Sequence, residues 1–376
     1  MLVDFELVKI IQPLQEWFQK NARILPWREN PDPYHVWISE IMLQQTRVEA
    51  VKPYFDRFIT ELPNVKALAD CPEERYLKLW EGLGYYNRVR NLHVAARQIM
   101  EGFGGRIPED FESLLKLKGI GRYTAGAIAS IAYKKRVPAV DGNVLRVLTR
   151  VSGDDSDIMK QSVRNIIEER LFILMQERKE LIPEVFNQAL MELGALVCVP
   201  NGTPHCNRCP WNDFCVARLE NRIAEIPVKK KAKARKIEKR TVFVLRDGDR
   251  VAIQKRPAEG ILAGMYELPN TLSQLSEKEA ITFLKKRGYE VLRIQSLGKA
   301  KHIFSHVEWH MTGYAVFVDS FSLEEHTPEG VLFVDARDVA KRYAIPSAFA
   351  AYAKYMQIDL GAKRLKQEQI TENNKK

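Results

Sequence analysis

The spacing of apolar residues divides the chain into a long helical part and a shorter part with strands. From about residue 5 to 220, apolar residues recur every three or four positions, a period typical of helices that bury one face. One face of the predicted N-terminal helix carries Leu7, Ile11, Leu14 and Phe18. The pattern therefore predicts an all-α domain over residues 1–220.

Beyond residue 240 the period changes to two. Residues 241–245 and 251–253 are strand-like runs separated by Asp247-Gly248-Asp249, a pattern typical of a β-hairpin. One helix is predicted over 276–286, and further strands over 290–294, 302–310, 313–318 and 331–334. These elements predict a smaller α+β domain over 241–360. The polar residues 361–376 predict a disordered tail.

A basic run separates the two periodic regions. Residues 227–240 hold eight basic residues and one acidic residue. Two interpretations fit this run within an interdomain linker over 221–240: a solvated linker, or a linker that also lies along a DNA backbone. The formal net charge of +10 fits a polyanionic partner such as nucleic acid, and it equally fits an ordinary basic surface.

The chain shows no sign of membrane insertion or export. No apolar run reaches about 18 residues, so no membrane span is predicted. Asp4 and Glu6 stand near the start, where a signal peptide would have basic residues followed by an apolar core. These features predict a cytoplasmic protein.

Four of the five cysteines crowd into one segment, with the spacing Cys198-x7-Cys206-x2-Cys209-x5-Cys215. Without an export signal, this clustering favours metal ligation over disulfides. Zinc sites usually use two Cys-x-x-Cys pairs, and only one such pair is present. The asymmetric spacing favours a 4Fe–4S cluster, with zinc or an unfilled remnant as the alternatives. Cys71 stands alone and is predicted to be an ordinary packed or surface thiol.

A glycine-containing turn, Leu117-Lys118-Gly119-Ile120-Gly121, lies between predicted helices over 111–116 and 123–133. Glycine at both positions would let the backbone turn tightly and point its N–H groups outward, which makes a phosphate site at a helix start. Asp141 follows twenty residues after Gly121, just before another predicted helix. This hairpin with one carboxylate resembles the helix-hairpin-helix, Gly-Pro-Asp-type superfamily of DNA base-excision glycosylases.

Glu40 and Asp141 are the candidate carboxylates for acid–base chemistry. Glu40 lies among apolar residues of a helix predicted to begin at Asp32-Pro33, and an apolar setting would raise its pKa and keep it protonated. Asp141 precedes a helix, where backbone N–H groups and the dipole favour the ionised form. From the local sequence alone, a surface helical glutamate and a plain helix cap are the favoured explanations of the two positions.

Longer segments make the resemblance more specific. Residues 37–48 and 80–86 resemble the signature of adenine DNA glycosylases of the MutY type, as does Leu25-Pro26-Trp27-Arg28. With the hairpin and the cysteines, the match covers most of residues 20–220. Residues 186–195 resemble the iron–sulfur end of endonuclease III-like glycosylases, although the first cysteine gap has seven residues where that family usually has six.

The resemblance implies hydrolysis of the N-glycosidic bond of adenine mispaired with 8-oxoguanine, or with guanine, in double-stranded DNA. Such hydrolysis needs a proton on the leaving base and stabilisation of the positive sugar. The resemblance gives the acid role to Glu40 and the sugar-stabilising or transient nucleophile role to Asp141, assisted by Tyr123 and Asn143. Related thymine-glycol enzymes have a lysine nucleophile where this chain has Tyr123, which favours a monofunctional glycosylase.

The reaction also requires the adenine to leave the base stack. The resemblance implies that Gln45 and Tyr85 wedge beside the opposing 8-oxoguanine. It implies an adenine pocket formed by Arg23, Trp27 and Arg28. It also implies a monovalent cation at the hairpin and further DNA contacts by Thr46, Arg47, Arg88, Lys118, Gly119 and Gly121. Without the resemblance, polar helix ends, a core aromatic and solvated charges explain these positions.

The second domain carries its own resemblance. Residues 260–270 resemble the Nudix-like domain of these enzymes, but the helix over 277–288 lacks the carboxylate-rich box of Nudix hydrolases, so pyrophosphatase activity is not expected. Phe304-Ser305-His306 resembles the loop that reads 8-oxoguanine. An exposed strand end with a polar pair is the alternative.

The sequence thus predicts a multidomain protein: an all-α helix-hairpin-helix glycosylase domain with an iron–sulfur loop, plus a smaller α+β Nudix-like domain. We expect a nucleoid-associated monomer that acts on double-stranded DNA containing 8-oxoguanine opposite adenine. Two rival functions remain. One is a sibling glycosylase acting on another mispair, such as thymine opposite guanine. The other is a non-catalytic iron–sulfur protein that binds DNA as a scaffold.

Overall fold

The computed structural model describes residues 5–29, 31–229, 234–318 and 330–356. Its contacts divide the chain into two compact units: residues 1–71 with 90–232, and residues 72–89 with 233–376. The predicted tail over 361–376 lies outside the described residues. None of the described helices is long and apolar enough to span a membrane.

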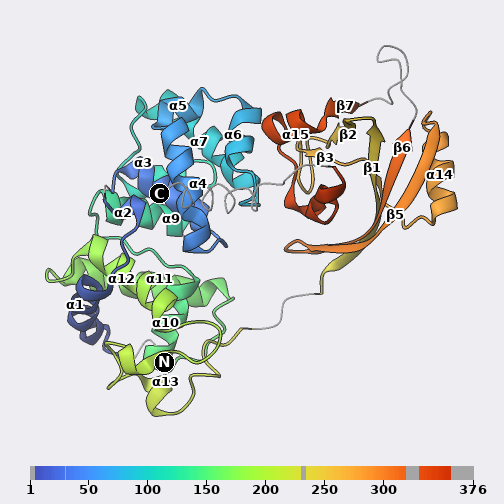
Figure 1. Cartoon of the computed structure of the whole chain (residues 1–376). Coiled ribbons are helices and arrows are strands. Elements are labelled where there is room, and N and C mark those ends of the chain that lie inside the picture. Colours follow the sequence, from blue (N-terminus) through green and yellow to red (C-terminus); the bar gives the residue numbers. More distant parts are fainter. Residues whose placement is uncertain (1–4, 30, 230–233, 319–329, 357–376) are drawn as a thin grey trace, which may run out of the picture. The chain divides into compact units, whose positions relative to one another are not determined.

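The first unit is built from helices (Figure 1). They are η2 (Leu7–Ile10), α1 (Ile11–Asn21), α2 (Pro26–Glu29), α3 (Pro33–Leu43), α4 (Val48–Glu61), α5 (Val65–Ala69), α7 (Asn87–Phe103, which starts in the second unit), α8 (Phe111–Leu115), α9 (Arg122–Ala127), the π-helix η3 (Ile128–Ala132), α10 (Gly142–Ser152), α11 (Gln161–Glu177), α12 (Pro183–Leu196), η4 (Cys206–Arg208) and α13 (Val216–Leu219).

The largest core of this unit joins the N-terminal helix to α10, α11 and α12, with Leu14, Val144 and Leu171 among its buried residues. The predicted apolar face of the N-terminal helix is confirmed, because its apolar residues belong to this core. Trp211, from the cysteine segment, is buried in the same cluster and donates its indole N–H to the Ile10 carbonyl at 3.2 Å. The cysteine segment is thereby packed onto the helical core.

Helix starts follow the capping residues in the sequence. Asp32 caps α3 by accepting a hydrogen bond from the Tyr34 N–H at 2.8 Å, as predicted.

In the hairpin, Gly119 has a φ of +78°, and a Cβ there would lie 2.6 Å from the Asn91 Cβ, so only glycine fits. Gly121 has an ordinary φ of −94°. The expectation that both glycines are needed for the turn is therefore correct for Gly119 alone.

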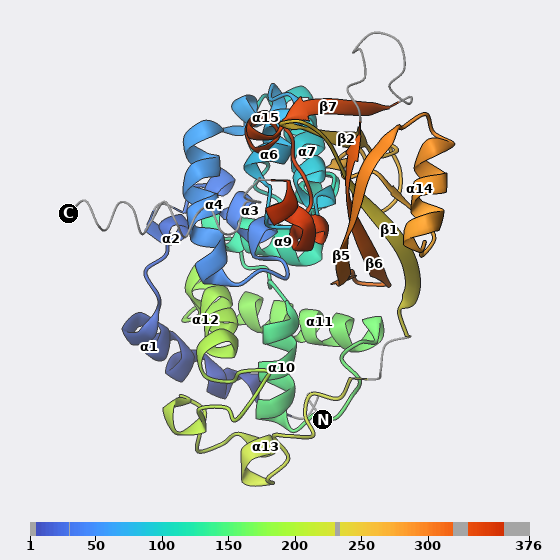
Figure 2. The same cartoon turned by 45° about the vertical axis from the view of Figure 1, so that its right-hand side comes forward.

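The second unit contains one mixed sheet with strand order β3-β2-β1-β6-β5, in which β1 and β6 are parallel (Figure 2). Its strands are β1 (Lys236–Asp247), β2 (Arg250–Lys255), β3 (Tyr266–Glu267), β4 (Asn270–Thr271), β5 (Val291–Ile303), β6 (Val307–Val318) and β7 (Val331–Asp335). Its helices are α6 (Glu73–Leu79), α14 (Glu277–Lys285), α15 (Ala336–Arg342) and η5 (Ser347–Tyr355). The predicted β1–β2 hairpin is confirmed by the antiparallel pairing of these strands.

Alternation along β1 supplies two cores, one on each face of the sheet. Val242 and Val244 pack with residues of α15 and η5, whereas Phe243 and Leu245 pack with residues of α14. The period of two in the sequence therefore reflects a sheet that is covered on both faces. The covering helix α14 begins at a complete capping box formed by Ser276 and Glu279.

Two strand limits differ from the prediction. β1 begins at Lys236, so residues 236–240 belong to the sheet and not to the linker. The run 302–310 is not one strand, because β5 ends at Ile303 and β6 begins at Val307. The Phe304 N–H donates to the Val307 carbonyl at 2.8 Å and closes a tight turn. Without a Gly or Pro to mark it, this turn was hidden in the alternating pattern.

The segment 72–89 is attached to the second unit, although the sequence pattern assigns it to the helical domain. Glu81 accepts a hydrogen bond from the Ile345 N–H at 3.0 Å and another from Lys78 at 2.5 Å. The Lys78 ammonium also donates to the Tyr343 carbonyl at 3.1 Å. These contacts form a polar clamp between α6 and the connection from α15 to η5.

Candidate active site

A cavity of about 990 Å³ in the first unit gathers ten residues that the sequence analysis singled out. Its walls come from α2, α3, α9, α10 and α12 and from the connections between them. The ten residues are Arg23, Trp27, Arg28, Glu40, Gln45, Thr46, Arg47, Tyr123, Asp141 and Asn143. Residues far apart in the sequence thus meet around one space of the size of a small-molecule pocket.

Glu40 is buried at the wall of this cavity. Its side chain accepts a hydrogen bond from the Tyr123 hydroxyl, and the residue is only 6% exposed. Burial raises the pKa of Glu40 to about 7, against the opposing effect of the Tyr123 hydrogen bond. The Tyr123 hydroxyl also lies 3.2 Å from the Met191 sulfur. At neutral pH a substantial share of this carboxyl therefore exists as an acid that can give up a proton.

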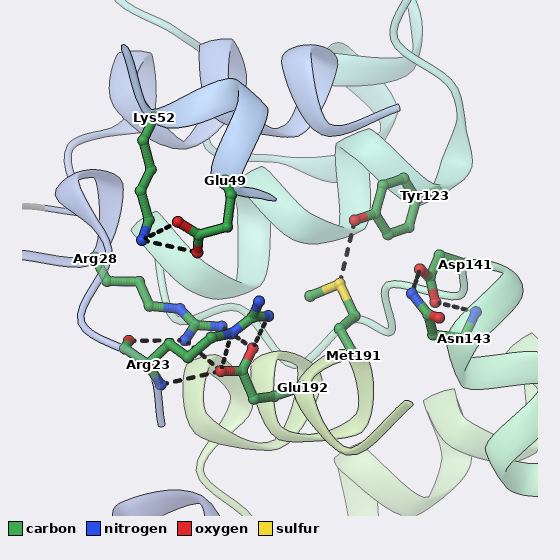
Figure 3. A network of polar contacts seen from close by, with 9 residues as sticks. All are labelled: Arg23, Arg28, Glu49, Lys52, Tyr123, Asp141, Asn143, Met191 and Glu192. Atoms are coloured by element: carbon green, nitrogen blue, oxygen red, sulfur yellow. Dashed lines mark hydrogen bonds and ion pairs between the residues drawn. The ribbon is translucent and has the colours of Figure 1, made fainter. Parts of the chain in front are cut away.

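Asp141 caps α10 and lines the same cavity, and Figure 3 shows it bonded to Asn143. One carboxylate oxygen accepts hydrogen bonds from the N–H groups of Asn143 and Val144, both at 2.8 Å. The other accepts from the Asn143 side-chain amide at 2.7 Å. Burial raises the pKa of Asp141, and these hydrogen bonds lower it. The expectation of a lowered pKa was wrong in its net direction, because it considered the helix terminus without the burial.

Glu192 is a further carboxylate of the cavity that sequence reasoning missed. It lies on α12 and binds the guanidinium groups of Arg23 at 2.7 Å and Arg28 at 3.0 Å (Figure 3). Burial alone would raise its pKa, but hydrogen bonds from both arginines lower the pKa of Glu192 to about 2. The sequence did carry a signal for this residue. Arg23 and Arg28 flank Trp27, and charged side chains next to a buried residue need a partner of opposite charge. Glu192 is an acidic residue on an otherwise apolar face of its helix.

A chain of hydrogen bonds leads from Asp141 toward the cysteine segment. Asn143, which donates to Asp141, accepts a hydrogen bond from the buried Arg146 guanidinium at 2.8 Å. Arg146 donates in turn to the carbonyls of Gly194 and Cys198, each at 2.8 Å. One arginine thus holds the cap of α10, the end of α12 and the start of the cysteine segment together.

The four clustered cysteines line a single cavity next to Arg150. The Arg150 guanidinium donates to the Cys198 sulfur at 3.3 Å. Within the described residues, no three Cys, His, Asp or Glu side chains are close enough together to bind one metal ion. Zinc needs four ligand atoms at about 2.0–2.3 Å.

Comparison with known proteins identifies the family. Residues 38–171 match the model of the HhH-GPD superfamily base excision DNA repair protein, and residues 241–355 match the NUDIX domain. The chain is 33% identical over 320 residues to the adenine DNA glycosylase of Buchnera aphidicola (subspecies Baizongia pistaciae), covering 83% of this chain and 87% of the relative. The chain belongs to the adenine DNA glycosylase family.

A mammalian relative extends this result. The mouse adenine DNA glycosylase is 34% identical over 365 residues, which cover 81% of this chain and 70% of the mouse protein. A solved structure of a thermostable thymine-DNA glycosylase has a TM-score of 0.49 and 27% identity, covering 57% of this chain and 96% of that one. The two family models and the curated relatives confirm the predicted fold class, and they show that the chain is a DNA glycosylase with a Nudix-like domain.

Two residues of this DNA glycosylase that were predicted to wedge into the duplex have unusual backbones. Gln45, which follows α3 at the cavity, has a φ of +58°, and Tyr85 has a φ of +49°. Left-handed backbone at residues other than glycine costs free energy and is concentrated at functional sites. At Gln45 this backbone directly follows the C-cap of α3, where helices commonly end in a left-handed residue, so the roles of Gln45 and Tyr85 at the duplex stay predictions.

In the second unit, Tyr85 lies next to the predicted lesion-reading turn. Tyr85 is 49% exposed, and its hydroxyl accepts from the Ser305 hydroxyl at 3.5 Å. Ser305 and His306 are exposed at the tip of the turn, and the Phe304 ring packs edge-on against buried Trp309 at 4.8 Å. The structure thus brings together two segments that are 220 residues apart.

The remaining predicted DNA contacts lie outside these two groups. Arg88 donates to the carbonyls of Leu83 and Gly84, and its guanidinium lies 5.5 Å from the centre of the Tyr85 ring. These contacts hold the Arg88 side chain against the chain around Tyr85, and its role as a DNA contact stays a prediction. Lys118, in the hairpin, donates its backbone N–H to the Gln98 side chain at 2.8 Å, which anchors the turn to α7.

Proposed function

We propose that this protein hydrolyses the N-glycosidic bond of adenine mispaired with 8-oxoguanine, or with guanine, in double-stranded DNA. The observation that carries the proposal is the pair of carboxyl groups in one cavity: Glu40, whose pKa is about 7, and Asp141, which holds three hydrogen bonds. Both relatives described above are named adenine DNA glycosylases.

Glu40 is proposed as the general acid. An adenine anion is a poor leaving group, so a ring nitrogen must be protonated as the bond to the sugar breaks. A carboxyl with a pKa of about 7 keeps its proton in a substantial share of the molecules at neutral pH and readily gives it up. The Tyr123 hydroxyl, bonded to Glu40, orients the acid.

Asp141 is proposed to stabilise the positive charge that develops on the sugar, or to bond transiently to its C1′ atom. Its three donors, two backbone N–H groups and the Asn143 amide, hold both oxygens in place before the reaction. Such fixed electrostatic groups lower the barrier without reorganising. Water then completes the hydrolysis with retention of configuration.

The cavity is proposed to receive the adenine after it leaves the base stack. Arg23 and Arg28 are held by Glu192, so that the two guanidinium groups offer fixed donors, and the Glu192 carboxylate an acceptor, around the edge of a purine. Buried Trp27 provides an aromatic wall. Gln45, with Thr46 and Arg47 beside it, lies at the cavity, where the vacated stack would be filled.

The second unit is proposed to identify the opposite base. Ser305 and His306 are exposed at the turn, with Tyr85 beside them, and they offer donors and acceptors to an oxidised purine edge. The hairpin over 117–121 is proposed to bind a DNA phosphate together with a monovalent cation. The protein would act as a monomer on the nucleoid.

Cys198, Cys206, Cys209 and Cys215 are proposed to hold a 4Fe–4S cluster. The cluster would tie their segment to the helical unit. Buried Arg150, which donates to the Cys198 sulfur, would balance the negative charge of the thiolates. Metal analysis should find iron, about four atoms per chain. Stoichiometric zinc, or protein that folds with no metal, would contradict this assignment.

The proposed function is tested by single-turnover base release from duplexes with adenine opposite 8-oxoguanine, guanine or thymine. We expect fast release from the first, slower release from the second and none from the third. Glu40→Gln and Asp141→Asn should each abolish release while duplex binding is largely kept. Glu16→Gln, which alters an exposed carboxylate on α1, is the control.

Other outcomes would point to the rival functions. A near-normal rate in either Glu40→Gln or Asp141→Asn would refute the assigned roles. Tight binding without release from any duplex would favour the scaffold function or another target base, and thymine opposite guanine would be tested next.

A further inference from the structure

Asn187 is a fully buried polar residue on the side of α12 that packs against the chain segment leading to Asp141. Its side-chain oxygen accepts a hydrogen bond from the Ala139 N–H at 3.0 Å. Its side-chain nitrogen donates to the Val137 carbonyl at 2.9 Å and to the Ser130 hydroxyl at 2.8 Å. Both amide hydrogens and the amide oxygen are therefore used, which is uncommon for a side chain that merely fills space.

The segment that Asn187 binds runs straight into the cavity. Residues 137–139 precede Val140 and Asp141, which both line the cavity. The segment is also in direct contact with α9: a Cβ on Gly126 would lie 2.1 Å from the Pro138 carbonyl oxygen. A displacement of residues 137–139 away from α9 would therefore move the carboxylate of Asp141 relative to that helix.

The third hydrogen bond of Asn187 reaches the same helix. Ser130 belongs to the π-helix η3, which continues α9, and α9 also carries Tyr123, the hydrogen-bond partner of Glu40. A π-helical turn shifts the register of the residues that follow it, and such turns are frequent at functional sites. Asn187 thus ties the segment before Asp141 to the helix that orients Glu40.

We propose that Asn187 is a positioning residue that sets the place of Asp141 relative to the pair formed by Glu40 and Tyr123. The proposal rests on the proposed function. Asn187 lines no part of the cavity and acts through the backbone of residues 137–139. A misplacement of about 1 Å in a catalytic group can cost about 100-fold in rate, so loss of these hydrogen bonds should slow base release far more than it weakens DNA binding.

Asn187→Leu tests this role in the full-length protein, because leucine has a similar volume and none of the three hydrogen bonds. We expect the single-turnover rate on adenine opposite 8-oxoguanine to fall about 100-fold. The Kd for a duplex with a non-hydrolysable adenosine analogue should change less than about threefold, since no residue facing the cavity is altered. Ser130→Ala removes one of the three Asn187 bonds, together with the bond from the Ser130 hydroxyl to the Gly126 carbonyl, and should give a smaller fall in rate.

Thr149→Val is the matched control. Thr149 is also fully buried and hydrogen-bonded, to the Leu145 carbonyl at 2.8 Å within α10, but it does not touch residues 137–139. It should lower Tm without lowering the rate of the folded protein. If Thr149→Val and Asn187→Leu slow base release equally at equal loss of Tm, Asn187 has only a structural role and the proposal is wrong.

Two further outcomes are decisive. An active parent protein together with a folded Asn187→Leu variant of unchanged rate would refute the positioning role and leave the proposed function intact. A parent protein that releases no adenine would refute the proposed function, and the positioning role with it. If Asn187→Leu does not fold, Asn187→Asp keeps the acceptor for the Ala139 N–H, and an unchanged rate in both this variant and Ser130→Ala would overturn the proposal.

Discussion

Three carboxyl groups around one cavity differ in charge because their partners differ. Glu40 meets a tyrosine hydroxyl and apolar surroundings, Asp141 meets three neutral donors, and Glu192 meets two arginines. The pKa of Glu40 is raised to about 7 and that of Glu192 is lowered to about 2. Side chains of the same chemical type can therefore serve as an acid and as a fixed anion in one site.

The raised pKa of Glu40 predicts a pH dependence of base release. The acid form is present below the pKa of about 7 and is lost as the pH rises through it. Rates measured at subsaturating protein should therefore be level below pH 6 and fall about tenfold per unit above pH 8, by the general acid mechanism. A profile that is level up to pH 9 would show that Glu40 is not the acid.

Ser305 predicts a change in discrimination. Ser305→Ala removes an exposed hydroxyl from the turn beside Tyr85. The preference for 8-oxoguanine over guanine should fall about threefold to tenfold, the effect of one net hydrogen bond, while the rate opposite guanine stays level. Ser296→Ala, at an exposed position of the preceding strand β5, is the control. An unchanged ratio of the two rates would contradict a reading role for Ser305.

At the scale of elements, α12 contacts several parts of the first unit at once. Within three turns it presents Asn187 to the segment before Asp141, Met191 and Glu192 to the cavity, and Gly194 to the start of α10. A Cβ on Gly194 would lie 2.6 Å from the Asn143 Cβ, so the two helices touch through backbone. Glycine inside this helix permits a contact that any side chain would prevent.

Gly194→Ala should therefore separate α12 from α10. Overpacking a buried contact costs about 1–3 kcal/mol, which lowers Tm by roughly 2–6 °C, and the displaced Asn143 should slow base release. Gly102→Ala in α7 is the control, because a Cβ there meets no atom within 4 Å and alanine favours helix. Equal melting temperatures for the two variants would rule out this account of the helix contact.

The elements themselves were largely predictable, because their signals are local. The cap at Asp32, the hairpin glycine at 119 and the alternation along β1 each depend on a few neighbouring residues. The resemblance indicated a loop at Phe304-Ser305-His306, but the alternating pattern predicted a strand through it. Glu192 and Asn187 were not assigned because their partners are 48 to 169 residues away; a local pattern can mark a polar residue on an apolar helix face, but it does not encode the partner.

At the scale of the whole molecule, the chain passes between its two units three times, after Cys71, after Val89 and after Ala232. The first family model, over residues 38–171, therefore spans residues of both units. The polar clamp of Lys78 and Glu81 belongs to the second unit, although the sequence of its helix lies inside the first match. Family boundaries and structural boundaries consequently do not coincide in this chain.

A chain broken between Ala232 and Lys233 should therefore remain assembled. The first fragment contains residues 72–89, which contact residues 343–345 of the second fragment. When the fragments are co-expressed, we expect them to elute together on size exclusion. Lys78→Met combined with Glu81→Ala should weaken that association. Complete separation of the parent fragments would show that the clamp contributes no useful affinity.

The clamp also has an evolutionary consequence. A gene that acquired or lost the Nudix-like domain by joining or cutting at the basic linker would still carry the other half of this contact in residues 72–89. Selection would then have to act on two separate stretches of the gene at once. In glycosylases without the second domain, we expect the amino acids at the positions of Lys78 and Glu81 to vary, because no clamp constrains them.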